Sequence, residues 1–105
     1  MSDSSLAPVF EALGHPVRLS LVARLRRGGR QSLGQLAVGR SISRQAVTKH
    51  LATLEAVGLV RGTRYGRETV FEFDPRPLGP ARDYLDEVAD QWEKKLGDLK
   101  DFLGE

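Results

Sequence analysis

The chain has 105 residues, of which 40% are hydrophobic, and a net charge of +2. These values indicate one globular domain with a modest core. It contains no cysteine, which excludes disulfide bonds and thiolate metal sites. The N-terminus lacks the basic and apolar regions of a signal peptide, and no apolar run approaches the roughly 18 residues that span a bilayer. We therefore expect a cytoplasmic protein without a membrane segment.

The charge is distributed unevenly along the chain. Residues 1–73 carry 11 Lys and Arg against 5 Asp and Glu, a net charge of +6. Residues 74–105 carry 5 against 9, a net charge of −4. A basic body followed by an acidic segment suggests that the first part meets a polyanion, although two ordinary solvated surfaces would look the same.

Apolar residues at helical spacing predict four helices in the first part of the chain. We expect them at Leu6–Leu13, Pro16–Arg27, Leu33–Val38 and Arg44–Val57. Pro16 suits the first position of a helix, and Ser32 and Ser43 are good N-caps. Gly58 fits the left-handed position that ends the fourth helix. His15 falls at the N-cap of the second helix, where Asp or Ser would serve better.

The fourth helix has one apolar and one polar face. The apolar face is formed by Val47, Leu51, Leu54 and Val57. Its exposed leading edge is formed by Arg44, Gln45, Thr48 and Lys49. Arg and Lys can donate to guanine, Gln can pair with adenine, and Thr can contact a phosphate or the thymine methyl group. Two short helices of this kind joined by a turn match the helix-turn-helix, although a solvated helix face would also be polar.

A basic hairpin follows the fourth helix. Val60–Tyr65 and Glu68–Phe73 have the alternation of strands around a turn at Gly66. Phe71 and Phe73 share one face of the second strand, which we expect to join the core. Three arginines near the turn can reach phosphates or the minor groove: Arg61, Arg64 and Arg67.

A long amphipathic helix is predicted over Pro80–Leu103, after a proline-rich connector at 74–80 that we expect to continue neither strand nor helix. Its apolar stripe consists of Ala81, Leu85, Val88, Trp92, Leu96, Leu99 and Leu103. So long a stripe exceeds what a small domain covers by itself, and the same helix of a second copy is the simplest cover. The alternative is a helix packed wholly on its own domain.

Four segments together resemble the ArsR-type winged helix-turn-helix transcriptional regulators. They are Leu13–Arg18 (LGHPVR), Ser43–Leu51 (SRQAVTKHL), Leu54–Val60 (LEAVGLV) and Gly66-Arg67. The resemblance covers roughly residues 6–103. It implies a mainly α fold of about five helices with a two-stranded β-hairpin as the wing. It also implies one domain over residues 1–105, with a DNA-binding core at 6–73 and a dimerisation helix at 80–103.

Members of this family are typically homodimers built through their first and last helices, and most are repressors. The resemblance therefore implies a dimer that places two recognition helices in successive major grooves of a partly palindromic operator on double-stranded DNA. Together with the pattern of basic residues, it gives a DNA-binding set: Ser43, Arg44, Gln45, Thr48, Lys49, His50, Arg61, Arg64 and Arg67. For His50, we favour a packing or phosphate-contact role. The dimerisation set is Leu6, Val9, Phe10, Leu85, Val88, Trp92, Leu96 and Leu99.

The chain departs from the metal-sensing members of that family. Those members carry Cys-x-Cys or mixed Asp, His and Glu ligand sets, whereas the third helix here has neither Cys nor His, and the last helix has carboxylates without an imidazole. Carboxylates alone suit transition metals poorly. The Trp-containing last helix, with its repeated leucines, resembles the metal-independent branch. We therefore expect no metal and no cofactor.

The sequence also bears on two other classes of function. An enzyme is disfavoured because no Ser/His/Asp or Cys/His set and no phosphate-binding Gly-rich motif is present. A winged-helix module for protein–protein assembly is the main alternative. Such a module would tolerate acidic or apolar residues on the leading edge, whereas here that edge is polar and basic.

Overall fold

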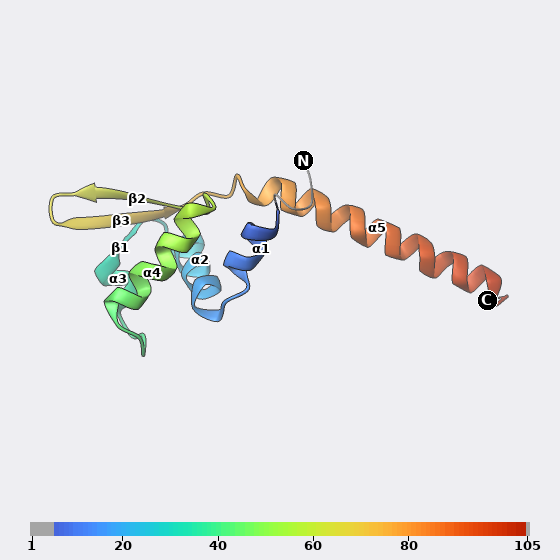
Figure 1. The fold of residues 1–105 in the computed structure, drawn as a ribbon, viewed down its shortest axis with the longest axis horizontal. Coiled ribbons are helices and arrows are strands. Elements are labelled where there is room, and N and C mark those ends of the chain that lie inside the picture. Colours follow the sequence, from blue (N-terminus) through green and yellow to red (C-terminus); the bar gives the residue numbers. More distant parts are fainter. Residues whose placement is uncertain (1–5, 105) are drawn as a thin grey trace.

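The computed structural model describes residues 6–104, which form five helices and three short strands (Figure 1). The elements in chain order are α1 (Ala7–Leu13), α2 (Pro16–Gly28), β1 (Gln31–Ser32), α3 (Leu33–Ala37), α4 (Arg44–Ala56), β2 (Val60–Tyr65), β3 (Glu68–Phe73) and α5 (Leu78–Phe102). The predicted fold class, mainly helical with a β-hairpin wing, is confirmed. The bounds of both wing strands agree with the prediction.

The body of the molecule is packed around the apolar face of α4. Val47, Leu51 and Leu54 have no exposed surface. They meet other fully buried side chains from α2, α3 and the start of the wing: Leu21, Leu36 and Leu59. Because this face is held on several sides, the rotation of α4 about its axis is fixed by packing. The predicted apolar face is thus confirmed, with Val57 only half-buried at its end.

Side-chain and backbone caps define where α3 and α4 begin and end. Ser32 accepts from the Gln35 amide at 3.2 Å while the Gln35 side chain accepts from the Ser32 amide at 2.9 Å, a reciprocal capping box. Ser43 accepts from the Ala46 amide at 3.1 Å. Both predicted N-caps are confirmed. At the end of α4, Gly58 has φ of +80°, which only glycine adopts without strain.

One strand escaped prediction. β1 pairs antiparallel with β3, so the sheet has the order β1-β3-β2 rather than two strands. Gln31 lies opposite Phe71, and Ser32 lies opposite Val70. A two-residue strand is too short to show alternation, and Ser32 also serves as the N-cap of α3. The wing is therefore attached along one edge to the chain that leads into the helix-turn-helix.

The connector before α5 corrects another prediction. We expected no helix before Pro80, but α5 begins at Leu78, after Pro77 as the N-cap. The first amides of a helix have no partner within the helix, so a proline at Pro80 removes no hydrogen bond there. Before it, the guanidinium and then the backbone amide of Arg76 donate to Asp74, and these bonds lower the pKa of Asp74 to about 2. The connector is thus a compact turn.

Figure 1 shows α5 leaving the body as a long projecting rod. Only its first turns touch the rest of the chain, where Ala81 is buried and the ring of Tyr84 lies 6.1 Å from that of Phe10 in α1. Farther along, Leu85, Trp92 and Leu99 each expose more than half of their surface, at 53%, 60% and 52%. The predicted apolar stripe exists, and most of it has no cover within the described chain.

A cluster of Arg18, His15 and His50 joins α1 and α2 to α4. Arg18 donates to the carbonyls of Ala12 at 2.7 Å and Glu11 at 3.2 Å, at the end of α1. Its Nη1 lies 3.3 Å from Nδ1 of His50. The ring of His15 lies 4.5 Å from that of His50, and Nδ1 of His15 accepts from the Val17 amide at 3.1 Å. His15 is therefore an effective N-cap, and the cluster connects the end of α1 to α4.

This cluster predicts a loss of stability in mild acid. Partial burial, and then the charges of His15, Arg18 and Arg40, lower the pKa of His50 below its ordinary value. The unfolded chain therefore takes up the His50 proton near pH 6.5, whereas the folded chain does so only at lower pH. We expect the free energy of unfolding to fall as the pH drops through about 6.5 and to level off below the folded-state pKa.

Chemical denaturation at a series of pH values and one protein concentration measures this effect. His50→Gln keeps an acceptor for Arg18 but cannot titrate, so it should lose the His50 part of the pH dependence. Identical pH profiles for the two proteins would contradict the assignment to His50.

Candidate nucleic-acid interface

Four polar side chains form the exposed edge of α4. They are Arg44, Gln45, Thr48 and Lys49, which are all exposed, whereas Val47, Leu51 and Leu54 of the same helix are buried. The hydroxyl of Thr48 donates to the carbonyl of Arg44 at 2.9 Å, which leaves its oxygen free to accept. The sequence prediction that these four side chains share one exposed edge is confirmed. The edge can donate to acceptors in a groove of a nucleic acid.

Arg44 reaches from α4 back over α3. A Cβ atom on Gly34 would lie 3.1 Å from Nη2 of Arg44, so the guanidinium occupies the space that this glycine leaves open. Ser43, the N-cap, is also exposed beside it. The first turn of α4 therefore presents its amides and a positive side chain at one place, which suits a phosphate or another anion.

The wing carries its arginines in two different settings. Arg61 lies 3.3 Å from Glu72, which also lies 3.4 Å from Arg30. Arg64 donates to the carbonyl of Gly66 at 3.0 Å in the turn, and Arg67 is exposed next to it. Among residues 6–104, neither Arg64 nor Arg67 forms an ion pair. Figure 1 shows that the wing and α4 lie together at the end of the molecule opposite the projecting α5.

The structure separates His50 from the other predicted site residues. Its ring is half-buried on the flank of α4, against His15 and Arg18 of the preceding elements. Of the two roles that the sequence left open, packing accounts for these contacts. Arg61 likewise lies at the base of the wing with a carboxylate beside it, rather than at the tip.

Sequence reasoning did not identify the arginines that hold α3 in place. Arg24 donates to the carbonyls of Gln35 at 2.9 Å and Leu36 at 3.3 Å, and Arg40 donates to the carbonyl of Leu36 at 2.7 Å. These bonds satisfy carbonyls at the end of α3 that have no partner within the helix. Burial, and then the charge of Arg24, lower the pKa of Arg40. No feature of the sequence distinguishes these arginines from those on the surface.

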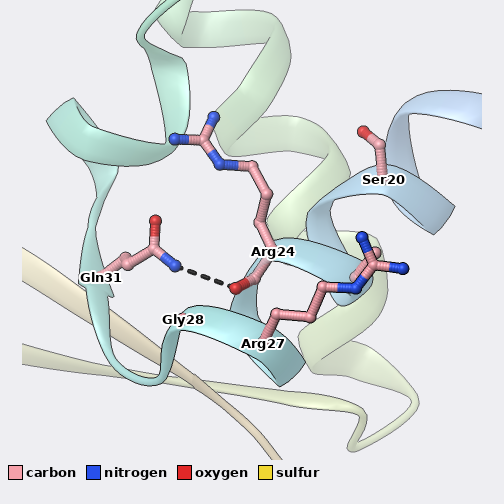
Figure 2. A pocket seen from close by; sticks show the side chains of 6 residues that line it. Ser20, Arg24, Arg27, Gly28 and Gln31 are labelled. Atoms are coloured by element: carbon pink, nitrogen blue, oxygen red, sulfur yellow. Dashed lines mark hydrogen bonds between the residues drawn. The ribbon is translucent and has the colours of Figure 1, made fainter.

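An open hollow of about 520 Å³ lies beside these arginines on α2 (Figure 2). Its lining comprises Ser20, Ala23, Arg24, Arg27, Gly28 and Gln31. Most of its polar groups already bond to the chain: Gln31 donates to the Arg24 carbonyl at 3.0 Å, and Ser20 accepts from Arg40 at 2.7 Å. These bonds tie α2 to β1 and to the turn before α4. The lining residues therefore connect structural elements of the chain, and we assign no ligand to the hollow.

Within the described part of the chain, no three His, Asp or Glu side chains come close enough together to hold a metal ion. None of the helices between residues 6 and 104 combines the length and apolarity needed to cross a membrane.

Comparison with known proteins assigns the family. Residues 13–63 match a helix-turn-helix domain family. The chain is 36% identical over 76 residues to the HTH-type transcriptional regulator YuzN of Bacillus subtilis, covering 67% of this chain and 83% of YuzN. It is 34% identical over 88 residues to the HTH-type transcriptional repressor SmtB of Mycobacterium tuberculosis, covering 84% of this chain and 63% of SmtB.

Among solved structures, the chain is similar to an ArsR-like transcriptional regulator from Rhodococcus sp. RHA1. The TM-score is 0.77 with 32% identity, and the match covers 94% of this chain and 92% of that one. Both the sequence relatives and the fold are those of DNA-binding transcriptional regulators, not of enzymes. The chain therefore belongs to the ArsR family of winged helix-turn-helix transcriptional regulators.

Proposed function

We propose that this regulator is a homodimeric repressor, acting in the cytoplasm, that binds a partly palindromic operator and needs no metal to do so. The observation that carries the proposal is the pairing of an exposed basic edge on α4 with an uncovered apolar stripe on α5. The first provides a DNA reader and the second a means of joining two readers. The similarity to SmtB of Mycobacterium tuberculosis, a transcriptional repressor, supports repression as the direction of regulation.

In the proposed complex, residues 6–73 form the DNA-binding core. Arg44, Gln45, Thr48 and Lys49 enter the major groove, while Ser43 and the first amides of α4 face a phosphate. Arg64 and Arg67 contact the backbone beside that groove. Arg61 contributes positive charge at the base of the wing, and His50 supports α4 through its packing. The composition of the exposed edge disfavours the alternative, a protein-assembly module, because its four side chains are polar or basic rather than acidic or apolar.

The reading role of α4 predicts a sequence-dependent loss on substitution. Arg44→Ala or Gln45→Ala should cost about 1–3 kcal/mol of binding free energy on the preferred site and relax the preference at one base position. Fluorescence anisotropy with a panel of single-base operator variants measures both quantities. Lys94→Ala is a control for lost charge, because Lys94 is exposed on α5. Equal weakening on every DNA sequence would make the substituted residue a backbone contact instead.

We propose that α5, residues 80–103 in particular, forms most of the dimer contact. Leu85, Val88, Trp92, Leu96 and Leu99 lie along one side of the helix, and the last three are 60%, 55% and 52% exposed. Of the proposed α1 residues, Leu6 and Val9 are already buried within the chain. We propose that these two, with Phe10 against Tyr84, support the base of α5 while the stripe meets the partner.

Charged residues in the stripe should separate the subunits. Leu85→Glu combined with Trp92→Glu places two carboxylates in the proposed contact, so we expect monomers or unfolded chains and a loss of operator binding. Lys94→Glu is the matched control, because a residue two positions from Trp92 lies on the opposite side of a helix. Sedimentation equilibrium gives the mass, and circular dichroism reports folding. A stable dimer of the double variant that still binds DNA would reject this contact.

We propose that release from DNA does not depend on a metal. The support is the sequence itself, which has no cysteine and only two histidines. Both histidines lie in the cluster with Arg18, whose positive charge disfavours a cation. We expect micromolar zinc or nickel to leave the affinity for the operator unchanged in an anisotropy titration. A metal-dependent loss of binding that a chelator reverses would show that this regulator senses metal.

A further inference from the structure

The end of α4 is joined to the wing by a side chain as well as by the backbone. The amide of Gly62 in β2 donates to Oε1 of Glu55, in the last turn of α4, at 2.9 Å. Between them, the Leu59 amide donates to the Leu54 carbonyl at 3.0 Å, and the Gly58 amide to the Glu55 carbonyl at 3.0 Å. This pair of backbone bonds is a Schellman motif, which fixes the direction in which the chain leaves α4.

The hydrogen bond between the Gly62 amide and Glu55 requires a residue without a side chain at position 62. A Cβ atom there would lie 2.8 Å from the ring of Phe71 and 2.9 Å from Oε1 of Glu55. Phe71 is the cross-strand partner of Gly62 and is 7% exposed, so its ring cannot move away without disturbing the core. The ring and the carboxylate thus occupy the space that any other residue at position 62 would fill.

The contact between Glu55 and Gly62 lies within the three-stranded part of the sheet, one residue before that part ends. Phe71 of the central strand pairs with Gly62 on one side and with Gln31 of β1 on the other. One edge is therefore tied to the chain leading into α3, and the other is tied to α4 through Glu55. Beyond Thr63 and Val70, β2 and β3 continue toward the turn at Gly66 without a third strand.

We propose that Glu55 is a positioning residue that sets the angle between the recognition helix and the wing, and so the point at which Arg64 and Arg67 reach the DNA backbone. The inference rests on the proposed contact of the wing with DNA. A carboxylate in the last turn of a helix is unfavourable with respect to the helix dipole. The bond to the Gly62 amide explains what this side chain does there.

The test is a cycle of substitutions that separates the acceptor from the charge. Glu55→Gln removes the charge but keeps an oxygen that accepts from Gly62. Glu55→Met removes both and has a similar length. Each variant is made with the native wing and with the double change Arg64→Ala and Arg67→Ala. Operator affinity is measured as a function of salt, and exchange of the Gly62 amide proton is followed by NMR.

With the native wing, we expect Glu55→Met to bind about threefold or more weakly than Glu55→Gln, because contacts that share a support are coupled. That difference should vanish once both wing arginines are gone. The Gly62 amide should stay protected in Glu55→Gln and exchange faster in Glu55→Met. A merely structural role would weaken binding equally with and without the arginines.

Two results would overturn the inference. One is equal affinity and equal Gly62 protection in the Gln and Met variants. The other is a Met-against-Gln difference that persists without the arginines, because Glu55 would then act through α4 alone. A failure of the proposed wing contact has a separate sign: removing both arginines would leave the slope of log affinity against log salt unchanged, instead of flattening it by about 0.9 per lost contact.

Discussion

The rest of the structure depends on the burial of one face of α4. Val47, Leu51 and Leu54 are held by side chains from α2, α3 and the start of the wing, which fixes the rotation of the helix. Once that face is buried, the polar side chains at intervening positions must face solvent. The same packing that stabilises a small domain therefore also aims its polar edge outward. The side chains of Arg18, Arg24 and Arg40 then hold the neighbouring helices in place by donating hydrogen bonds to backbone carbonyls of α1 and α3.

The helix ends and the wing strands could be predicted from the sequence because they depend on residues close together in the chain. Ser32, Ser43 and Gly58 mark helix ends because their bonds and backbone angles involve only near neighbours in the chain. The wing strands follow from alternation within six residues each. What escaped prediction depends on distant partners. β1 exists only because β3 lies beside it, and the carbonyl bonds of Arg24 depend on where α3 ends. The early start of α5 reflects the tolerance of a first helical turn for proline.

In the candidate site, too, the features that depend on near neighbours in the chain could be predicted, and those that depend on distant partners could not. The exposed edge of α4 could be derived from helical spacing, since burial of one face dictates exposure of the other. The environment of His50 could not, because His15 and Arg18 reach it from another element. The bond between Glu55 and Gly62 likewise joins a helix to a strand. A single chain also leaves most of the α5 stripe in water, which a stable fold rarely does with so large an apolar surface.

We propose that two copies of this chain read DNA together. Selection of binding sites from random duplex DNA with the purified protein tests it most directly. We expect enrichment of two inverted half-sites whose centres are about 10 base pairs, or a multiple of this, apart. Enrichment of a single undivided site, or no enrichment above unselected DNA, would contradict it.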